Sequence, residues 1–236
     1  MRLLLIRHGQ TPHNVAGALD TAFPGAGLTP LGEAQAGAVP GALAEVELAA
    51  VYASRLVRTQ LTAAPLAAAR GLEVVVRPGL EEIAAGEYEM RSDEPAVRAY
   101  VECVAGWMRG ELGHALPGGT DGHAFLRRYS EAVRDIAAGH GSTDTVAVVS
   151  HGAAIRVFST LAARLSPEVA ADLHLMNTGM SVLDGDPASG WELVRWQSEP
   201  LGGASLLDAS AHDVTGETAE EALDDVDVDV DDDVDG

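Results

Sequence analysis

The stretch "LLLIRHGQTPHN", residues 3–14, joins a short apolar run to an arginine, a histidine and a glycine. Four apolar residues, Leu3 to Ile6, have the composition of a strand that is buried on both faces of a sheet. Arg7 and His8 follow at the point where this strand would end. In open α/β sheets, ligands bind at the carboxyl ends of the strands. The stretch therefore predicts a polar site at the end of the first strand.

Similar short apolar runs recur along the chain and alternate with longer Ala- and Leu-rich segments. We expect strands at residues 2–6, 48–52, 73–76 and 145–149, and helices at residues 29–43, 55–69 and 152–164, the last ended by Ser166-Pro167. Alternating strands and helices form a parallel sheet that is covered by helices. The fold class is therefore α/β, a three-layer αβα sandwich.

Two further segments complete the expected fold. Residues 180–183 and 191–196 are separated by "DGDPASG" and predict an antiparallel hairpin at the edge of the mostly parallel sheet. Residues 91–119 end in "LPGG" and are interpreted as a helical insertion that covers one end of the sheet. We expect one domain, residues 1–200, followed by an acidic and disordered tail, residues 201–236.

Composition narrows the range of functions. The net charge is −21, and residues 217–236 hold 11 acids and no base, so binding to nucleic acid or anionic membranes is disfavoured. All 15 basic residues are arginines, which excludes a lysine Schiff base. Cys103 is the only cysteine, and no apolar run has the length of a signal peptide core or membrane span. We expect a cytoplasmic protein; a homodimer is left open.

Polar residues gather at the predicted carboxyl ends of several strands. The fourth strand ends "VVSHG", so His151 would lie near His8 if the two strands are neighbours in the sheet. The second strand is followed by "ASRLVRTQLTA", which contains Arg58, and the third by "LEEIAAGEYE", which contains Glu82. Guanidinium groups match phosphate oxygens in geometry and charge, and a neutral imidazole is a nucleophile. With Arg7 and Asn14, these residues predict a phosphate site with a proton donor.

Six segments in this order resemble the histidine phosphatase superfamily, which includes cofactor-dependent phosphoglycerate mutases and many metabolite phosphatases. They are "RHGQTPHN", "GLTPLGEAQA", "SRLVRTQLTA", "LEEIAAGEYE", "PGGTD" and "VVSHG", and the similarity covers residues 1–196. Each segment alone is a weak signal, whereas six in register are specific.

The resemblance implies a two-step phosphoryl transfer on a small phosphorylated substrate, without metal or cofactor. His8 would become phosphohistidine, while Glu82 would protonate the leaving oxygen and later deprotonate the attacking water. Arg7, Arg58 and His151 would stabilise the transferring group. Further phosphate or substrate contacts are expected from Asn14 and Gly152, from the backbone N–H groups of Gly9, Gln10 and Thr11, and from the loop around Asp20 and Thr21.

Some features depart from the family pattern. Met90 stands where family members commonly have glycine, which could narrow the pocket or change the turn, and "PGGTD" ends in Asp121 in place of a glutamate. His13 follows His8 by five residues and is read as an exposed loop histidine rather than a metal ligand.

Three functions follow from these observations. A phosphomonoesterase is favoured over a phosphoglycerate mutase because Glu82 is followed by "IAAG" and because residues 91–119 lack paired arginines. The third, a non-catalytic module that binds phosphorylated ligands or proteins, is disfavoured because the nucleophile and the acid are both present. The acidic tail is left open as an interaction element for a basic partner, and on that interpretation a chain cut at about Leu206 would keep its turnover.

Overall fold

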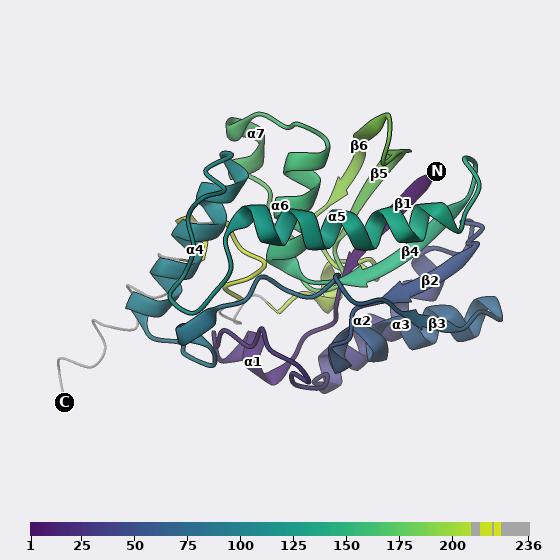
Figure 1. The fold of residues 1–236 in the computed structure, drawn as a ribbon. Coiled ribbons are helices and arrows are strands. Elements are labelled where there is room, and N and C mark those ends of the chain that lie inside the picture. Colours follow the sequence, from purple (N-terminus) through teal and green to yellow (C-terminus); the bar gives the residue numbers. More distant parts are fainter. Residues whose placement is uncertain (209–212, 219, 223–236) are drawn as a thin grey trace.

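A six-stranded sheet in the order β3-β2-β4-β1-β5-β6 forms the centre of the molecule (Figure 1). The computed structural model describes residues 1–208, 213–218 and 220–222. Four strands run parallel, and β5 and β6 form an antiparallel hairpin at one side of the sheet. This arrangement confirms the predicted fold class. The strands are β1 Arg2–Arg7, β2 Ala50–Ala53, β3 Val74–Val76, β4 Thr145–Ser150, β5 Met180–Asp186 and β6 Gly190–Gln197.

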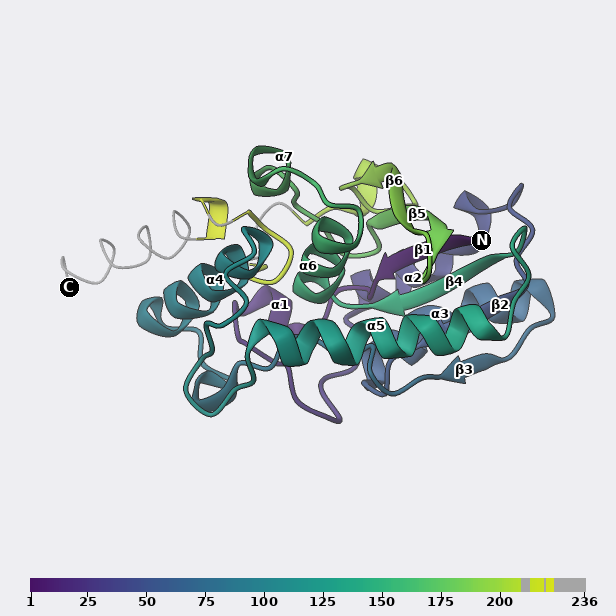
Figure 2. The ribbon, with the colours of Figure 1, turned by 45° about the horizontal axis from the view of Figure 1, so that its top comes forward.

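Helices cover both faces of this sheet (Figures 1 and 2). They are α1 Pro12–Val15, α2 Pro30–Ala42, α3 Val57–Arg70, α4 Glu94–Met108, α5 Gly122–Ala138, α6 Gly152–Ala162 and α7 Pro167–Ala171, with 3₁₀ turns at Gly86–Tyr88 and Ala204–Leu206. The core with α2 and α3 lies on one face, and the core with α4, α5 and α6 lies on the other.

The strand β1 shows why the chain needs both layers. Leu3 and Leu5 are fully buried in the core that contains α5 and α6, whereas Leu4 and Ile6 are buried in the core that contains α2 and α3. Successive side chains of a strand point to opposite faces, so an uninterrupted apolar strand requires cover on both sides. Removal of either helical layer would expose half of these side chains.

Two helical elements differ from the sequence expectation. Ser166-Pro167 does not end the preceding helix, because α6 already ends at Ala162; it begins α7, where Ser166 Oγ accepts a hydrogen bond from the Val169 N–H. Serine before proline marks a helix start as readily as a stop. The helix α5 was not predicted, although Phe125, Tyr129 and Ile136 repeat with helical spacing and are buried.

Part of the expected acidic tail packs against the domain. In residues 213–218, Asp213, Val214 and Glu217 are buried, and the Leu175 N–H donates to the Gly216 carbonyl at 2.7 Å. This part is therefore ordered and belongs to the folded body, in contrast to the expected disorder; residues 223–236 lie outside the described residues. None of the helices in the described part of the chain combines the length and apolar character needed to cross a bilayer.

Candidate active site

The carboxyl ends of β1 and β4 bring two histidines together. These strands are neighbours in parallel register, with Arg7 opposite Ser150, and the His8 N–H donates to the Ser150 carbonyl at 3.0 Å. The ring centroids of His8 and His151 are 5.3 Å apart, and both side chains are buried. The pairing of these strands, which lie far apart in the sequence, therefore places the two imidazoles at one edge of the sheet.

The hydrogen bond of His8 defines which ring nitrogen is available. Nδ1 lies 2.8 Å from the Gly9 carbonyl, and because a carbonyl can only accept, Nδ1 carries the proton. Burial, aided by the positive charges of Arg58 and Arg7, lowers the pKa of His8 well below its ordinary value. A neutral His8 therefore keeps the lone pair of Nε2 free for nucleophilic attack.

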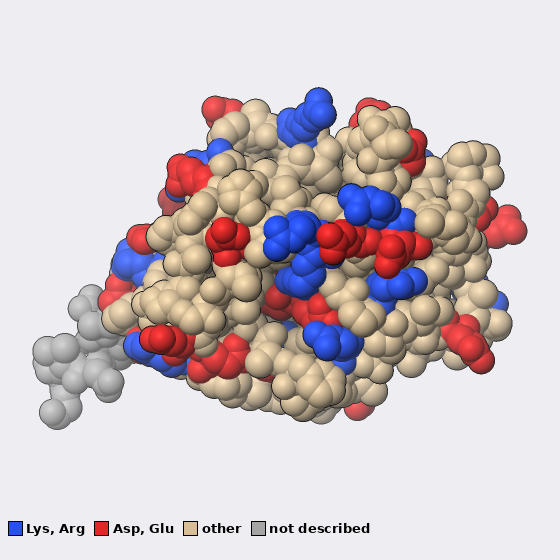
Figure 3. Space-filling model, in the orientation of Figure 1, with Lys and Arg blue, Asp and Glu red and all other residues tan. Residues whose placement is uncertain are grey.

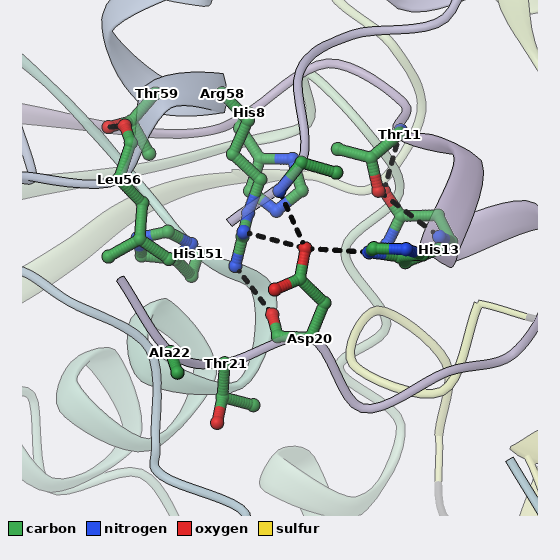
Figure 4. Close-up of polar contacts among 12 residues, drawn as sticks. His8, Thr11, His13, Asp20, Thr21, Ala22, Leu56, Arg58, Thr59 and His151 are labelled. Atoms are coloured by element: carbon green, nitrogen blue, oxygen red, sulfur yellow. Dashed lines mark hydrogen bonds and ion pairs between the residues drawn. The ribbon is translucent and has the colours of Figure 1, made fainter. Parts of the chain in front are cut away.

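Arg58 approaches the histidines from the first turn of α3 and is held by the loop at Asp20. Its Nη2 donates to the Asp20 carbonyl at 2.8 Å, and its Nη1 lies 3.3 Å from Asp20 Oδ2. Figure 4 shows this carboxylate between Arg58 and His13, whose Nδ1 lies 2.9 Å from Oδ2. His13 is therefore not simply exposed: it helps to fix the loop that orients Arg58. From the sequence, the loop around Asp20 is expected only to add contacts, and the bonds from Asp20 to Arg58 are found in the structure.

Glu82 is buried at the N-terminus of α6. Its Oε1 accepts from the Ile83 and Ala154 N–H groups at 2.9 and 2.8 Å, and its Oε2 accepts from the Ala153 N–H at 3.2 Å. Burial raises the pKa of Glu82, although the N–H groups of Ile83 and Ala154 act in the opposite direction. A carboxyl group with a raised pKa is suited to donating a proton near neutral pH.

His151 is fixed by a hydroxyl group. Its Nε2 lies 2.8 Å from Ser54 Oγ, and its Nδ1 has no hydrogen-bond partner among the described residues. Burial lowers the pKa of His151 well below its ordinary value, and the positive charge of Arg58 lowers it further. One imidazole nitrogen therefore remains available to a ligand.

Arg7 and Asn14 meet at an acidic residue that the sequence analysis assigned to the tail. Arg7 Nη2 and Asn14 Nδ2 both donate to Asp213 Oδ1, the latter at 3.0 Å. Arg7 also donates from Nη1 to the Leu175 carbonyl at 2.7 Å and from Nη2 to Thr215 Oγ1 at 2.9 Å. No local motif marks Asp213 among the many acids of the C-terminal region.

The backbone contacts expected of residues 9–11 require correction. The Gly9 N–H donates to Thr62 Oγ1, the Gln10 N–H to Gln35 Oε1, and the Thr11 N–H to Asn14 Oδ1, all within 3.0 Å. Each donor is thus satisfied inside the protein and is not free for a phosphate oxygen. These bonds instead fix the loop that follows His8.

Thr21 and Gly152 have identifiable structural roles at the site. Thr21 donates from its N–H to Glu89 Oε1 at 2.8 Å, and its hydroxyl accepts from the Ala85 N–H at 3.0 Å. A Cβ at Gly152 would lie 2.4 Å from the Thr215 carbonyl oxygen and 2.9 Å from Arg7 Nε, so only glycine allows this close approach. Thr21 therefore contributes hydrogen bonds to the loops around the site, and Gly152 allows Thr215 and Arg7 to approach the start of α6.

The backbone that carries His8 is supported by β5 and the loop before it. Asn177 Nδ2 donates to the His8 carbonyl at 3.1 Å, and the Gly179 carbonyl accepts from the Arg7 N–H at 3.0 Å. Thr178 adopts a φ of 58°, in the left-handed region that non-glycine residues rarely occupy. Strained residues of this kind gather at functional sites. No motif in the sequence marks this support.

A cavity of about 230 Å³ opens beside Glu82. Its lining combines aromatic side chains with charged ones: Thr21, Phe23, Arg55, Leu56, Glu81, Glu82, Ile83, Ala84, Trp107, Thr120, Phe125 and Arg128. Arg55 and Arg128 are paired with Glu81, at 2.6 and 3.2 Å. Figure 3 likewise shows basic and acidic side chains side by side on the face that α5 crosses. The lining therefore offers aromatic surface to an apolar group, and the charges of its two arginines and of Glu81 are paired with each other.

The two departures from the family pattern do not line this cavity. Met90 adopts a φ of 64°, so the backbone keeps a conformation typical of glycine, and its side chain is half exposed and does not line the cavity. Asp121 caps α5 by accepting a hydrogen bond from the Ala124 N–H at 2.8 Å. Met90 therefore does not narrow this cavity, and Asp121 starts a helix.

Comparison with known proteins gives matches over nearly the whole chain. A family model described as the histidine phosphatase superfamily (branch 1) matches residues 3–199. A PE-PGRS family protein of Mycobacterium tuberculosis is 38% identical over 224 residues, which cover 89% of this chain and 38% of that protein. The chain thus spans less than half the length of this relative.

Two further matches extend over almost the full length of the proteins compared. A probable phosphoglycerate mutase of Yersinia enterocolitica is 30% identical, with 90% of this chain and 98% of that protein covered. The structure of a mycobacterial glucosyl-3-phosphoglycerate phosphatase superposes with a TM-score of 0.71 at 25% identity, covering 84% of this chain and 99% of the other.

Proposed function

Because the chain belongs to branch 1 of the histidine phosphatase superfamily, we propose that it is a metal-independent phosphomonoesterase that acts on a small phosphorylated metabolite. The observation that carries this proposal is the state of His8, which is buried and neutral and has its Nδ1 bound to the Gly9 carbonyl. Its Nε2 is the nucleophile, and the nearby Glu82 is the proton donor.

The reaction has two steps. In the first, His8 Nε2 forms a bond to phosphorus while the ester oxygen leaves with the electron pair of its bond and takes the proton of Glu82. In the second, the Glu82 carboxylate removes a proton from water, and the resulting oxygen attacks phosphorus. The bond between phosphorus and Nε2 breaks, its electron pair returns to Nε2, and phosphate leaves, which restores the neutral form of His8.

Positive charge and hydrogen-bond donors stabilise the phosphoryl group during both steps. Arg58 and Arg7 supply two guanidinium groups, and His151 and Asn14 supply further polar contacts. Buried donors that are already oriented are more effective than donors in water because they need little reorganisation as charge develops. Asp20 holds Arg58 in this arrangement through the hydrogen bonds described above.

The test is release of inorganic phosphate in EDTA from a panel of phosphomonoesters that includes 3-phosphoglycerate. We expect release by the wild type, none by His8→Ala, and full release by His123→Ala, which removes an exposed histidine at the start of α5. A base-stable phosphoenzyme should form with the wild type and with His123→Ala but not with His8→Ala. Isomerised phosphoglycerate without free phosphate would favour a mutase, and the absence of both products would favour a binding module.

A further inference from the structure

The turn at residues 213–216, here called the C-terminal turn, encloses the guanidinium group of Arg7. Both terminal nitrogens of the Arg7 guanidinium are bound. Nη1 donates to the Leu175 carbonyl, and Nη2 donates to Thr215 Oγ1 and Asp213 Oδ1. A Cβ at Gly216 would lie 1.8 Å from Nη1, so the turn contacts the group directly. The Arg7 side chain is completely buried. The turn therefore leaves this side chain little freedom to rotate.

The third nitrogen of the Arg7 guanidinium remains available. Nε has no hydrogen-bond partner among the described residues, and it lies close to Gly152, the first residue of α6. The next two residues of α6 donate their N–H groups to Glu82. The C-terminal turn thus holds the Nη end of Arg7 and directs Nε toward the helix end where the proton donor is fixed.

The same carboxylate also holds Asn14. Asp213 Oδ1 accepts from Asn14 Nδ2 at 3.0 Å, while the Oδ1 of Asn14 accepts from the Thr11 N–H at 3.0 Å. Asp213 is 1% exposed, and a buried carboxylate requires partners of this kind. A single buried acid therefore connects two of the groups assigned to the phosphoryl site.

We propose that the C-terminal turn is an integral part of the active site and that Asp213 is the positioning residue that orients Arg7 and Asn14 toward the phosphoryl group. This inference rests on the proposed function. It replaces the expectation that a chain cut at about Leu206 keeps its turnover, because such a chain lacks the whole turn.

The first test is a pair of truncations of the full chain. A chain that ends at Thr218 retains the turn, and we expect its kcat and KM to match those of the wild type. A chain that ends at Leu206 loses the turn, and we expect kcat to fall about 100-fold, the size of effect that misplacement of a catalytic group by about 1 Å can have. Equal activity of the two truncated chains would overturn the proposal.

The second test is a double-mutant cycle of Asp213→Asn with Arg7→Ala, supported by melting curves that establish folding. Asp213→Asn should lower kcat about 100-fold in the wild-type background and by a clearly smaller factor when Arg7 is absent, because only the contact with Asn14 then remains to be lost. An equal loss in both backgrounds would indicate a merely structural role. Higher activity and tighter phosphate binding in Asp213→Asn would mean that the carboxylate competes with phosphate. Either result contradicts the proposal.

A third measurement separates this inference from the proposed function. If the wild type hydrolyses no ester, the proposed function fails, but the arginine side-chain signals in ¹⁵N NMR spectra still report on Arg7. In the wild type, the Nη signals of Arg7, assigned from the Arg7→Ala spectrum, should show slow rotation of the guanidinium. Asp213→Asn should abolish this slow rotation and weaken the binding of orthovanadate. Unchanged signals and unchanged orthovanadate binding would overturn the positioning role.

Discussion

Replacement of Glu82 by glutamine gives a sharp test of its role because the substitution keeps the size of the side chain and removes the proton. An alkyl phosphate needs a proton on its leaving oxygen, whereas a nitrophenolate leaves as the anion. We expect kcat for an alkyl phosphate to fall about 10²- to 10⁴-fold, the usual contribution of a positioned general acid. The first step with nitrophenyl phosphate should change little.

The structure also bounds the loss of stability. The two oxygens of Glu82 accept three backbone N–H bonds, and in glutamine one oxygen becomes an NH₂ group that cannot accept. If this group faces Ala153, a single N–H loses its acceptor, which costs about 1–3 kcal/mol. Removal of a buried acid offsets part of this cost, because burial already disfavours the charged carboxylate and raises its pKa. The variant should therefore fold.

The assay compares single-turnover rates on the two esters across pH, with Glu87→Gln as the control because Glu87 is exposed on the neighbouring turn. Since the protonated form of Glu82 is the donor, the wild-type rate on the alkyl ester should fall as pH rises through the raised pKa of this group. Glu82→Gln should lack this dependence. Equal losses on the two esters, or a retained pH dependence, would refute the assignment.

Two further predictions concern stability. Burial lowers the pKa of His8 and His151 in the folded state, so below about pH 6.5 the unfolded chain binds more protons than the folded chain. The free energy of unfolding should therefore fall as the pH is lowered, by up to about 1.4 kcal/mol per pH unit for each histidine. Urea unfolding between pH 5 and 7 measures this slope, and the same slope in a variant with asparagine at both positions would contradict its origin. Gly32→Ala should destabilise the protein by about 1–3 kcal/mol, because a Cβ there would lie 2.1 Å from the Gln10 carbonyl oxygen in the loop after His8. Gly37 lies in the same helix, and a Cβ there would have no neighbouring atom within 4 Å, so Gly37→Ala should stabilise the protein by about 0.5–1 kcal/mol. Equal melting temperatures for the two variants would exclude the close contact at Gly32.

The predictions that were accurate rest on local patterns. The apolar run Leu3 to Ile6 is buried as its composition predicts, whereas Val75 and Val76 of the edge strand β3 are exposed, so the positions of the strands and the layered fold follow from the sequence but the burial of each strand does not. His8 and His151 each stand directly after such a run, and parallel strands present their ends at one edge. The missed helix α5 had the same kind of local signal in Phe125 and Tyr129.

The sequence by itself determined the layered fold and the identity of the polar residues at the strand ends, because periodicity and the residue that follows a strand are local properties. Only the tertiary structure decided which nitrogen atoms remain free, because hydrogen bonds between distant segments depend on how the chain closes. The clearest case is Arg7, whose Nη2 meets Asp213 across 206 positions of sequence. No pattern near either residue encodes that contact.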